Sequence, residues 1–134
     1  MSNKEILTIH VHITGAEEVK GTTAEALMIY FDGECNSEIF QGKVLPGGID
    51  TQKQWYGEPR TLSARYILAG TDLTGQNCRI FIENNGCLNE NGDFITTPKI
   101  ITNSQALSFL ETSRLSGIVE CLENGVIIHI FQEN

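Results

Sequence analysis

The 134-residue sequence predicts an all-β protein, a single antiparallel β-barrel of about eight strands with one short helix. Two observations carry this prediction. Polar and apolar residues alternate with the period of two that is typical of strands, and clusters of Gly, Asn and Asp interrupt the alternation at short intervals. Strands with almost no helix to cover them must bury their apolar faces against each other, and closure into a barrel removes exposed edges. Residues 1–134 are therefore expected to form one domain around one core.

The first four predicted strands span residues 6–13, 24–31, 39–45 and 60–69. Every second residue is apolar from Leu7 to Ile13 and again from Leu62 to Leu68, so each of these strands has one face for the core. The other two strands are rich in aliphatic and aromatic residues. Turns are predicted at residues 15–17, 32–33 and 46–48, which contain the Gly, Asp and Pro residues that favour turns.

The last four predicted strands span residues 78–84, 94–102, 115–122 and 126–132. Turns are predicted at 84–86, 91–92 and 124–125, and Asn124-Gly125 is the strongest of these because Asn-Gly favours a two-residue hairpin turn. Residues 103–110 space their apolar side chains as a helix does, after Asn103 or Ser104 as a cap. This segment is the predicted short helix.

The charge balance excludes some classes of partner. The sequence contains seventeen acidic and nine basic residues, for a net charge of -8, and no cluster of Lys and Arg occurs. Nucleic-acid binding is therefore not expected. The chain opens without a charged and then apolar leader, and its apolar runs are far shorter than a membrane span. We therefore expect a soluble, cytoplasmic protein without a membrane partner. Cys78 and Cys121 lie in predicted apolar strands and no C-x-x-C pair occurs, which favours buried, reduced thiols.

His10 and His12, with Glu17 shortly after them, have the spacing of half a metal-binding motif. Alternation argues against a metal site, because it places Leu7 and Val11 on the core face and both imidazoles on the opposite, polar face. We expect solvated histidines, no metal and no cofactor.

One segment carries a family resemblance. Residues 42–52 read Gly-Lys-Val-Leu-Pro-Gly-Gly-Ile-Asp-Thr-Gln, and Ala64-Arg65-Tyr66 follows. This pattern resembles the bacterial and fungal family called domain of unknown function 3237, also uncharacterised protein family 0311. The resemblance implies a barrel related to allene oxide cyclase-like or calycin-like barrels, which bind small hydrophobic molecules in the lumen. Any reaction that it implies would be a cofactor-free isomerisation or cyclisation.

Five residues near this pattern are the leading site candidates. Asp50 and Gln52 follow the Pro-Gly-Gly turn and are expected at the barrel rim, beside an apolar lumen. Tyr66 is expected to point inward, either as a hydrogen-bonded core residue or as a ligand donor. Asn84 is expected to point inward at one mouth, unless its side chain caps its own turn. Arg65 is expected to point outward, unless its guanidinium pairs with Asp50 or with an acidic ligand. Tyr66 and Asp50 are the candidate catalytic pair.

Glu120 and His129 form a second candidate pair. A turn at Asn124-Gly125 would place them directly opposite each other on a face that also carries Ile127 and Phe131. A carboxylate beside an imidazole suits acid-base catalysis, but a structural ion pair or a subunit contact has the same composition.

Two functional hypotheses remain at this point. The first is that the barrel binds a small, partly apolar organic molecule, with or without catalysis. The second is a non-enzymatic barrel for homo-oligomerisation or protein interaction, with outer residues such as Ile127 and Phe131 buried between subunits. The width of the lumen distinguishes them.

Overall fold

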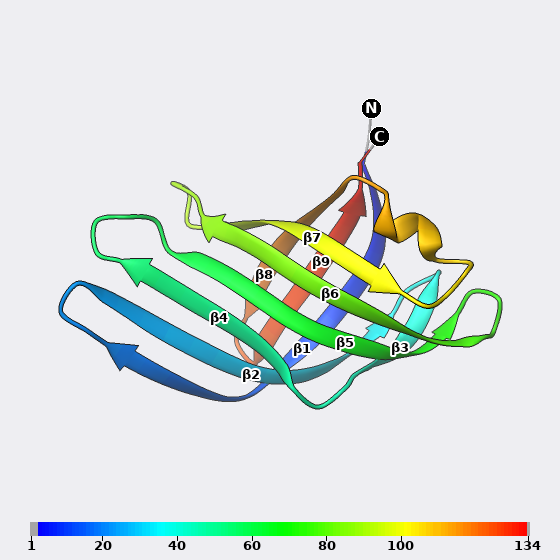
Figure 1. The fold of residues 1–134 in the computed structure, drawn as a ribbon, viewed down its shortest axis with the longest axis horizontal. Coiled ribbons are helices and arrows are strands. Elements are labelled where there is room, and N and C mark those ends of the chain that lie inside the picture. Colours follow the sequence, from blue (N-terminus) through cyan, green and yellow to red (C-terminus); the bar gives the residue numbers. More distant parts are fainter. Residues whose placement is uncertain (1–2, 134) are drawn as a thin grey trace.

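The computed structural model describes residues 3–133 and confirms the antiparallel barrel (Figure 1). Its elements, in chain order, are β1 (Lys4–Lys20), β2 (Ala24–Asn36), β3 (Phe40–Val44), β4 (Gly48–Trp55), β5 (Thr61–Asp72), β6 (Asn77–Leu88), β7 (Phe94–Thr102), the 3-10 helix η1 (Ser108–Glu111), β8 (Leu115–Leu122) and β9 (Gly125–Gln132). No helix within the described residues is long and apolar enough to cross a membrane.

The nine strands fill eight positions around the barrel because β3 and β4 share one position. Both lie between β2 and β5. β3 pairs with the C-terminal parts of these strands, and β4 pairs with their N-terminal parts. The barrel therefore has a β3 end, which also carries η1, and a β4 end, which carries the β1–β2, β4–β5 and β6–β7 turns (Figure 1).

Several strands are longer than predicted. β1 continues through residues 15–17 with a bulge between Ile13 and Gly15, so the predicted turn there is wrong. β2 likewise runs through the predicted turn at 32–33, and β6 runs through the one at 84–86. Gly86 is required by a close approach of strands, since a Cβ there would lie 2.2 Å from the Ile95 carbonyl oxygen. The turns at 46–48 and 91–92 are confirmed, with positive φ at Gly47 and Gly92.

The predicted helix at 103–110 is much shorter in the structure. Only Ser108–Glu111 is helical, as one 3-10 turn. Ser104 begins a separate turn in which its Oγ accepts a hydrogen bond from the Leu107 N–H at 3.1 Å. The segment supplies the fully buried side chains of Leu107 and Leu110 to the core, which explains the helical spacing of its apolar residues.

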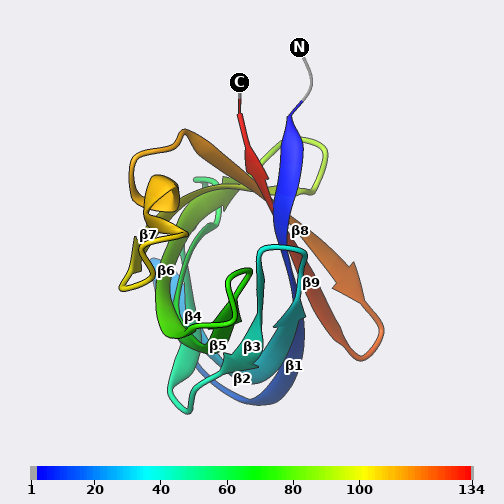
Figure 2. The same cartoon turned by 90° about the vertical axis from the view of Figure 1, so that its right-hand side faces the viewer.

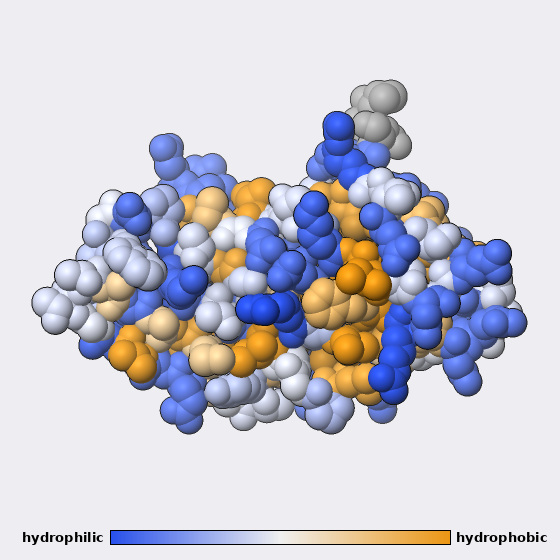
Figure 3. Space-filling model, in the orientation of Figure 1, coloured by the Kyte–Doolittle hydropathy of each residue, from blue (hydrophilic) through white to orange (hydrophobic). Residues whose placement is uncertain are grey.

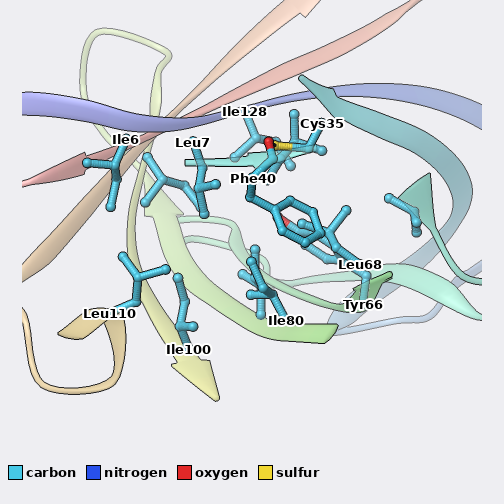
Figure 4. Packing of buried hydrophobic residues seen from close by; sticks show 14 of the residues in the cluster. Ile6, Leu7, Cys35, Phe40, Tyr66, Leu68, Ile80, Ile100, Leu110 and Ile128 are labelled. Atoms are coloured by element: carbon cyan, nitrogen blue, oxygen red, sulfur yellow. The ribbon is translucent and has the colours of Figure 1, made fainter. Parts of the chain in front are cut away.

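The core fills the β3 end of the barrel. Buried side chains from the inner faces meet there, as predicted from the alternation, and Figure 4 shows them converging around Phe40 and Leu68. Fully buried members are Leu7, Ile9, Leu68, Ile80, Ile82, Leu107 and Ile130. Tyr66 belongs to this core, and its ring meets Phe31 edge to face with the ring centroids 5.3 Å apart.

The barrel wall is less continuous at the β4 end. β7 and β8 pair only through Ile95 with Ile118 and Thr96 with Gly117. β9 pairs with β1 only as far as Val11, whereas β1 continues beside β2 to Lys20. Figure 2 shows the β8–β9 hairpin extending away from the rest of the wall. The hairpin therefore leaves an opening in the wall toward the β4 end.

Candidate functional site

A cavity of about 240 Å³ lies inside the barrel next to this opening. Its lining is mostly aliphatic and aromatic and comes from both sides of the barrel. The apolar lining includes Val11, Ile29, Phe31, Leu62, Phe94 and Ile128. Ile13, Cys121 and Leu122 also line the cavity and are exposed to solvent, which places its mouth beside the end of the β8–β9 hairpin.

Three polar side chains line this apolar space, from the two strands on either side of β5. Asp50 and Gln52 come from the inner face of β4, and Asn84 comes from the inner face of β6. Asp50 lies opposite Ala64 on β5, and Ala64 lies opposite Asn84. Since adjacent strands are about 4.8 Å apart, the carboxyl and the amide start from backbones about 10 Å apart. The small Ala64 side chain leaves the space between them open.

A hydrogen-bonded chain holds the carboxyl of Asp50. Arg60 donates from Nη1 to Glu25 Oε2 at 3.0 Å and from Nε to Gln52 Oε1 at 2.8 Å. Because a guanidinium only donates, the Gln52 oxygen must face Arg60, and the Gln52 Nε2 then donates to Asp50 Oδ2 at 2.9 Å. Arg60 was not predicted as a site residue. It stands between a turn and a strand, where no local motif marks it.

One carboxyl oxygen of Asp50 stays without a partner. Burial raises the pKa of Asp50, and the bond from Gln52 and the positive charge of Arg60 oppose that rise. The buried atoms Asp50 Oδ1 and Asn84 Oδ1 both lack a hydrogen-bond partner within the described residues. Asn84 is only 1% exposed. A buried polar atom without a partner costs about 1–3 kcal/mol, so a bound molecule that pairs with these oxygens would recover that free energy.

The structure changes the roles open to Tyr66 and Asn84. Tyr66 points inward as predicted, but it lies deeper than the predicted mouth, behind Phe31, and does not line the cavity. Burial, followed by the nearby Cys35, raises the pKa of its phenol. Asn84 points inward, and the alternative that it caps a turn is wrong because β6 continues through it. Asn84 therefore lines the cavity together with Asp50 and Gln52.

Arg65 lies outside the barrel. Its side chain is 57% exposed, and its Nε lies 4.0 Å from Glu83 Oε2 on the same outer face. The alternative in which Arg65 pairs with Asp50 is therefore wrong, and a role in binding inside this cavity is excluded by its position. The arginine next to the Asp50 carboxyl group is Arg60, which reaches it through Gln52.

Glu120 and His129 are hydrogen-bonded, with Glu120 Oε1 2.9 Å from His129 Nε2. They are not directly opposite each other, because the hairpin turn lies at Glu123-Asn124 and Glu120 faces Ile127. The turn lies one residue earlier than predicted, so the partner of Glu120 is Ile127, two residues before His129. A shift of two residues leaves Glu120 and His129 on the same face of the sheet. That face is the outer one, away from the cavity. Gly125 is needed where β9 starts, since a Cβ there would lie 2.4 Å from the Val11 carbonyl oxygen.

His129 also contacts a second carboxylate, since its Nδ1 lies 2.8 Å from Glu5 Oε2. Hydrogen bonds with Glu120 and Glu5 raise the pKa of His129, while partial burial opposes them. Burial raises the pKa of Glu5, but the bonds from Thr8 and His129 together bring it below its usual value. These contacts describe a charged cluster on the outer surface.

This cluster predicts a pH-dependent effect of His129→Gln. The folded-state pKa of His129 is raised, so its stabilisation is complete below the unfolded value of about 6.5 and is lost as the pH rises through the folded value. The melting temperature of His129→Gln should therefore fall further below that of the unmodified protein at about pH 6 than at about pH 9. Circular dichroism melts at both pH values measure this. A difference that does not change with pH contradicts the ion-paired cluster.

The two other histidines face outward, as predicted. His10 and His12 are exposed, and His12 Nε2 lies 3.0 Å from Glu34 on β2. Within residues 3–133 no group of His, Cys, Asp and Glu is arranged to hold a metal ion. All four cysteines are free thiols; Cys35 and Cys78 are buried, whereas Cys87 and Cys121 are exposed. The prediction that Cys121 is buried is wrong, because β8 leaves the wall at the cavity mouth.

Comparisons with known proteins agree with the fold. The family model described as protein of unknown function (DUF3237) matches residues 2–132. A UPF0311 protein of Clostridium acetobutylicum is 31% identical over 104 residues, which are 74% of this chain and 62% of that relative, so the match spans less than two thirds of the relative's length.

Two solved structures share the whole architecture. A protein with unknown function from Clostridium acetobutylicum ATCC 824 has 24% identity and a TM-score of 0.84, with 100% of both chains covered. A β-barrel-like protein from Acinetobacter baumannii has 16% identity and a TM-score of 0.81, with 98% of this chain and 94% of that chain covered. At these identities the structural likeness supports the fold alone. With the family model matching nearly its full length, this chain belongs to the DUF3237 family of proteins of unknown function.

Proposed function

We propose that this protein binds one small, partly apolar organic molecule in the cavity at the β4 end of the barrel. The observation that carries the proposal is Asn84, a nearly fully buried side chain that lines an apolar cavity together with Asp50, and each of the two residues has an oxygen, Oδ1, without a partner within the described residues. A few converging polar groups in an otherwise apolar concavity are typical of small-molecule sites, where they fix the orientation of the ligand.

The size of the cavity limits the ligand. An apolar cavity of about 150 Å³ is sufficient to bind benzene, whereas pockets for drug-sized ligands have about 300–1,000 Å³. The cavity of about 240 Å³ lies between these values. A single six-membered ring with a short polar substituent fits this range.

Any proton transfer at this site falls to Asp50. Asp50 is the carboxyl group among the residues that line the cavity, one of its oxygens has no partner within the described residues, and burial raises its pKa. Tyr66 does not line the cavity and its ring packs on Phe31, so we assign it to core packing; its buried hydroxyl has no hydrogen-bond partner within the described residues, unlike the predicted hydrogen-bonded core tyrosine. A cofactor-free isomerisation or cyclisation, as the family resemblance implies, would use the cavity walls to orient the substrate and Asp50 to move the proton.

Two cysteines offer a direct test of cavity occupancy. Cys121 lines the cavity mouth, whereas Cys87 is also exposed but lies on the outer face of β6. Benzyl alcohol, as a one-ring probe with a hydroxyl group, should raise the melting temperature by binding the folded state. The same probe should slow alkylation of Cys121 and leave the rate at Cys87 unchanged, as followed by mass spectrometry of peptides. If a saturating concentration of the probe does not change the alkylation rate of Cys121, the proposal is contradicted.

A second candidate function is association through the outer face, favoured by an apolar row. Ile67, Phe81 and Ile101 lie directly opposite one another on β5, β6 and β7, and Ile101 is 63% exposed. Figure 3 shows apolar residues gathered on this face between hydrophilic ones. Ile127 and Phe131 add a partly exposed apolar area on β9. A solution mass equal to one 14.8 kDa chain at micromolar concentration, measured by light scattering, would contradict self-association.

A further inference from the structure

We infer that the ligand of this cavity is a small primary amine, bound as its ammonium ion with the apolar part against the cavity wall. The inference rests on the proposed function and narrows the class of ligand. It follows from the kind of polar atoms that the protein leaves free in the cavity, from their number and from their charge.

The free polar atoms are acceptors. Asp50 Oδ1 and Asn84 Oδ1 are both oxygens without partners. The donors next to Asp50 are already used, since Arg60 donates to Glu25 and Gln52, and Gln52 donates to Asp50. The buried hydroxyl groups of Thr96 and Tyr66 also lack a partner within the described residues, but neither residue lines the cavity. The Asn84 Nδ2 is directed toward β8, at 3.6 Å from the position that a Cβ on Gly117 would take. A ligand that offers only a carbonyl or carboxylate group would therefore place acceptor against acceptor.

The number of acceptors favours an ammonium group over a hydroxyl group. A hydroxyl has one hydrogen to donate, whereas an ammonium has three donors and no acceptor. Asp50 and Asn84 stand on either side of Ala64, so one group between them can meet both oxygens only if it carries two donors. One ammonium group carries enough donors for both residues.

The charge of the site favours the same group. The positive charge of Arg60 is balanced by Glu25, at 3.0 Å, and both side chains are largely buried, with exposures of 16% and 23%. None of the residues that line the cavity is a cation, so the Asp50 carboxyl has no countercharge among them, and an ammonium ion supplies one. The net charge of -8 also attracts cations and repels anions on approach. The aromatic rings of Phe31 and Phe94 belong to the apolar part of the lining, which suits a ring.

Three probes of one ring size test the inference by calorimetric titration near neutral pH. Benzylamine carries donors and a charge, benzyl alcohol carries one hydroxyl group, and acetophenone carries only an acceptor. We expect benzylamine to bind at least about tenfold more tightly than benzyl alcohol, and acetophenone to bind most weakly. The comparison uses the unmodified protein, so it does not depend on the folding of a variant.

A matched pair of variants places the effect in the cavity. Asp50→Asn should lower the affinity for benzylamine about tenfold or more and should remove its advantage over benzyl alcohol. Glu83→Gln makes the same change of charge on the outer face, beside Arg65, and should leave all three affinities unchanged. If the unmodified protein binds amine and alcohol with equal affinity, or binds acetophenone more tightly, the inference that the ligand is an amine is wrong. The proposed function is not affected by that result. Failure of all three probes to bind overturns both.

Discussion

Ala64→Leu is expected to abolish binding of benzyl alcohol and benzylamine while leaving the protein folded. Ala64 is 5% exposed, lines the cavity and lies between Asp50 and Asn84 in the strand register. Leucine adds three carbon atoms to the space that we assign to the polar group of the ligand. The added carbons enter an apolar cavity, where each buried methylene gains about 0.8 kcal/mol, so the melting temperature should be equal or higher. Calorimetric titration and thermal melts measure the two effects.

Ala69→Leu is the matched control for this variant. Ala69 is on the same strand, β5, but side chains alternate between the two faces of a strand, and Ala69 lies on the outer face, opposite Arg79. The same added carbons there should change neither affinity nor folding by much. If Ala64→Leu binds both probes as tightly as the unmodified protein does, the space between Asp50 and Asn84 is not where the ligand lies.

Ile80→Ala is expected to have the largest effect on stability. Ile80 has no exposed surface and lies in the packed β3 end, outside the cavity lining (Figure 4). Removing its buried methyl and methylene groups leaves a void that should lower the free energy of unfolding by about 2–5 kcal/mol. Urea unfolding measures this loss, and the folded fraction should still bind benzyl alcohol because the cavity is not altered.

Asp50→Asn should have the opposite effects, with weaker ligand binding and no loss of stability. Its carboxyl is partly buried and has an unpartnered oxygen, so removing the charge should leave the free energy of unfolding unchanged or should raise it. This separation of stability from binding distinguishes a ligand group from a structural one. A loss of stability in Asp50→Asn as large as that in Ile80→Ala would assign Asp50 to a structural hydrogen-bond network.

The sequence was sufficient for the architecture because most strands bury one face. Alternation from Leu7 to Val11 and from Leu62 to Leu68 predicts the inner faces that the structure shows, and it places His10 and His12 outside. The same alternation places Asn84 inside. These predictions depend on the period of two alone and are unaffected by errors at the ends of strands.

The strand that carries Asp50 was missed for a reason connected with the site. The inner face of β4 holds Asp50, Gln52 and Gln54 in place of apolar residues, so its alternation of polar and apolar residues is absent. A strand that faces a polar part of a cavity has no apolar face, so its sequence lacks the alternation from which a strand is predicted. Local sequence rules are expected to fail at such positions, where the residues serve a site and not the core.

Glycine was the other source of error. Asn124-Gly125 and Asn85-Gly86 have the sequence of turns, but neither glycine has a positive φ, and both allow a neighbouring strand to pass close by. Close approach depends on residues far along the chain, such as Val11 for Gly125, which no local pattern contains. Arg60 was missed for a similar reason, since its partner Glu25 is 35 residues away.

A crystal structure of the protein soaked with benzyl alcohol tests the central claim most directly. The claim is that the cavity beside Asp50 and Asn84 is a ligand site. We expect density for one ring among the apolar side chains of the cavity, with the hydroxyl oxygen within about 3.2 Å of Asp50 Oδ1 or Asn84 Oδ1. A cavity that holds only protein side chains or water at a saturating concentration of the probe, or a probe bound only elsewhere, would contradict the account.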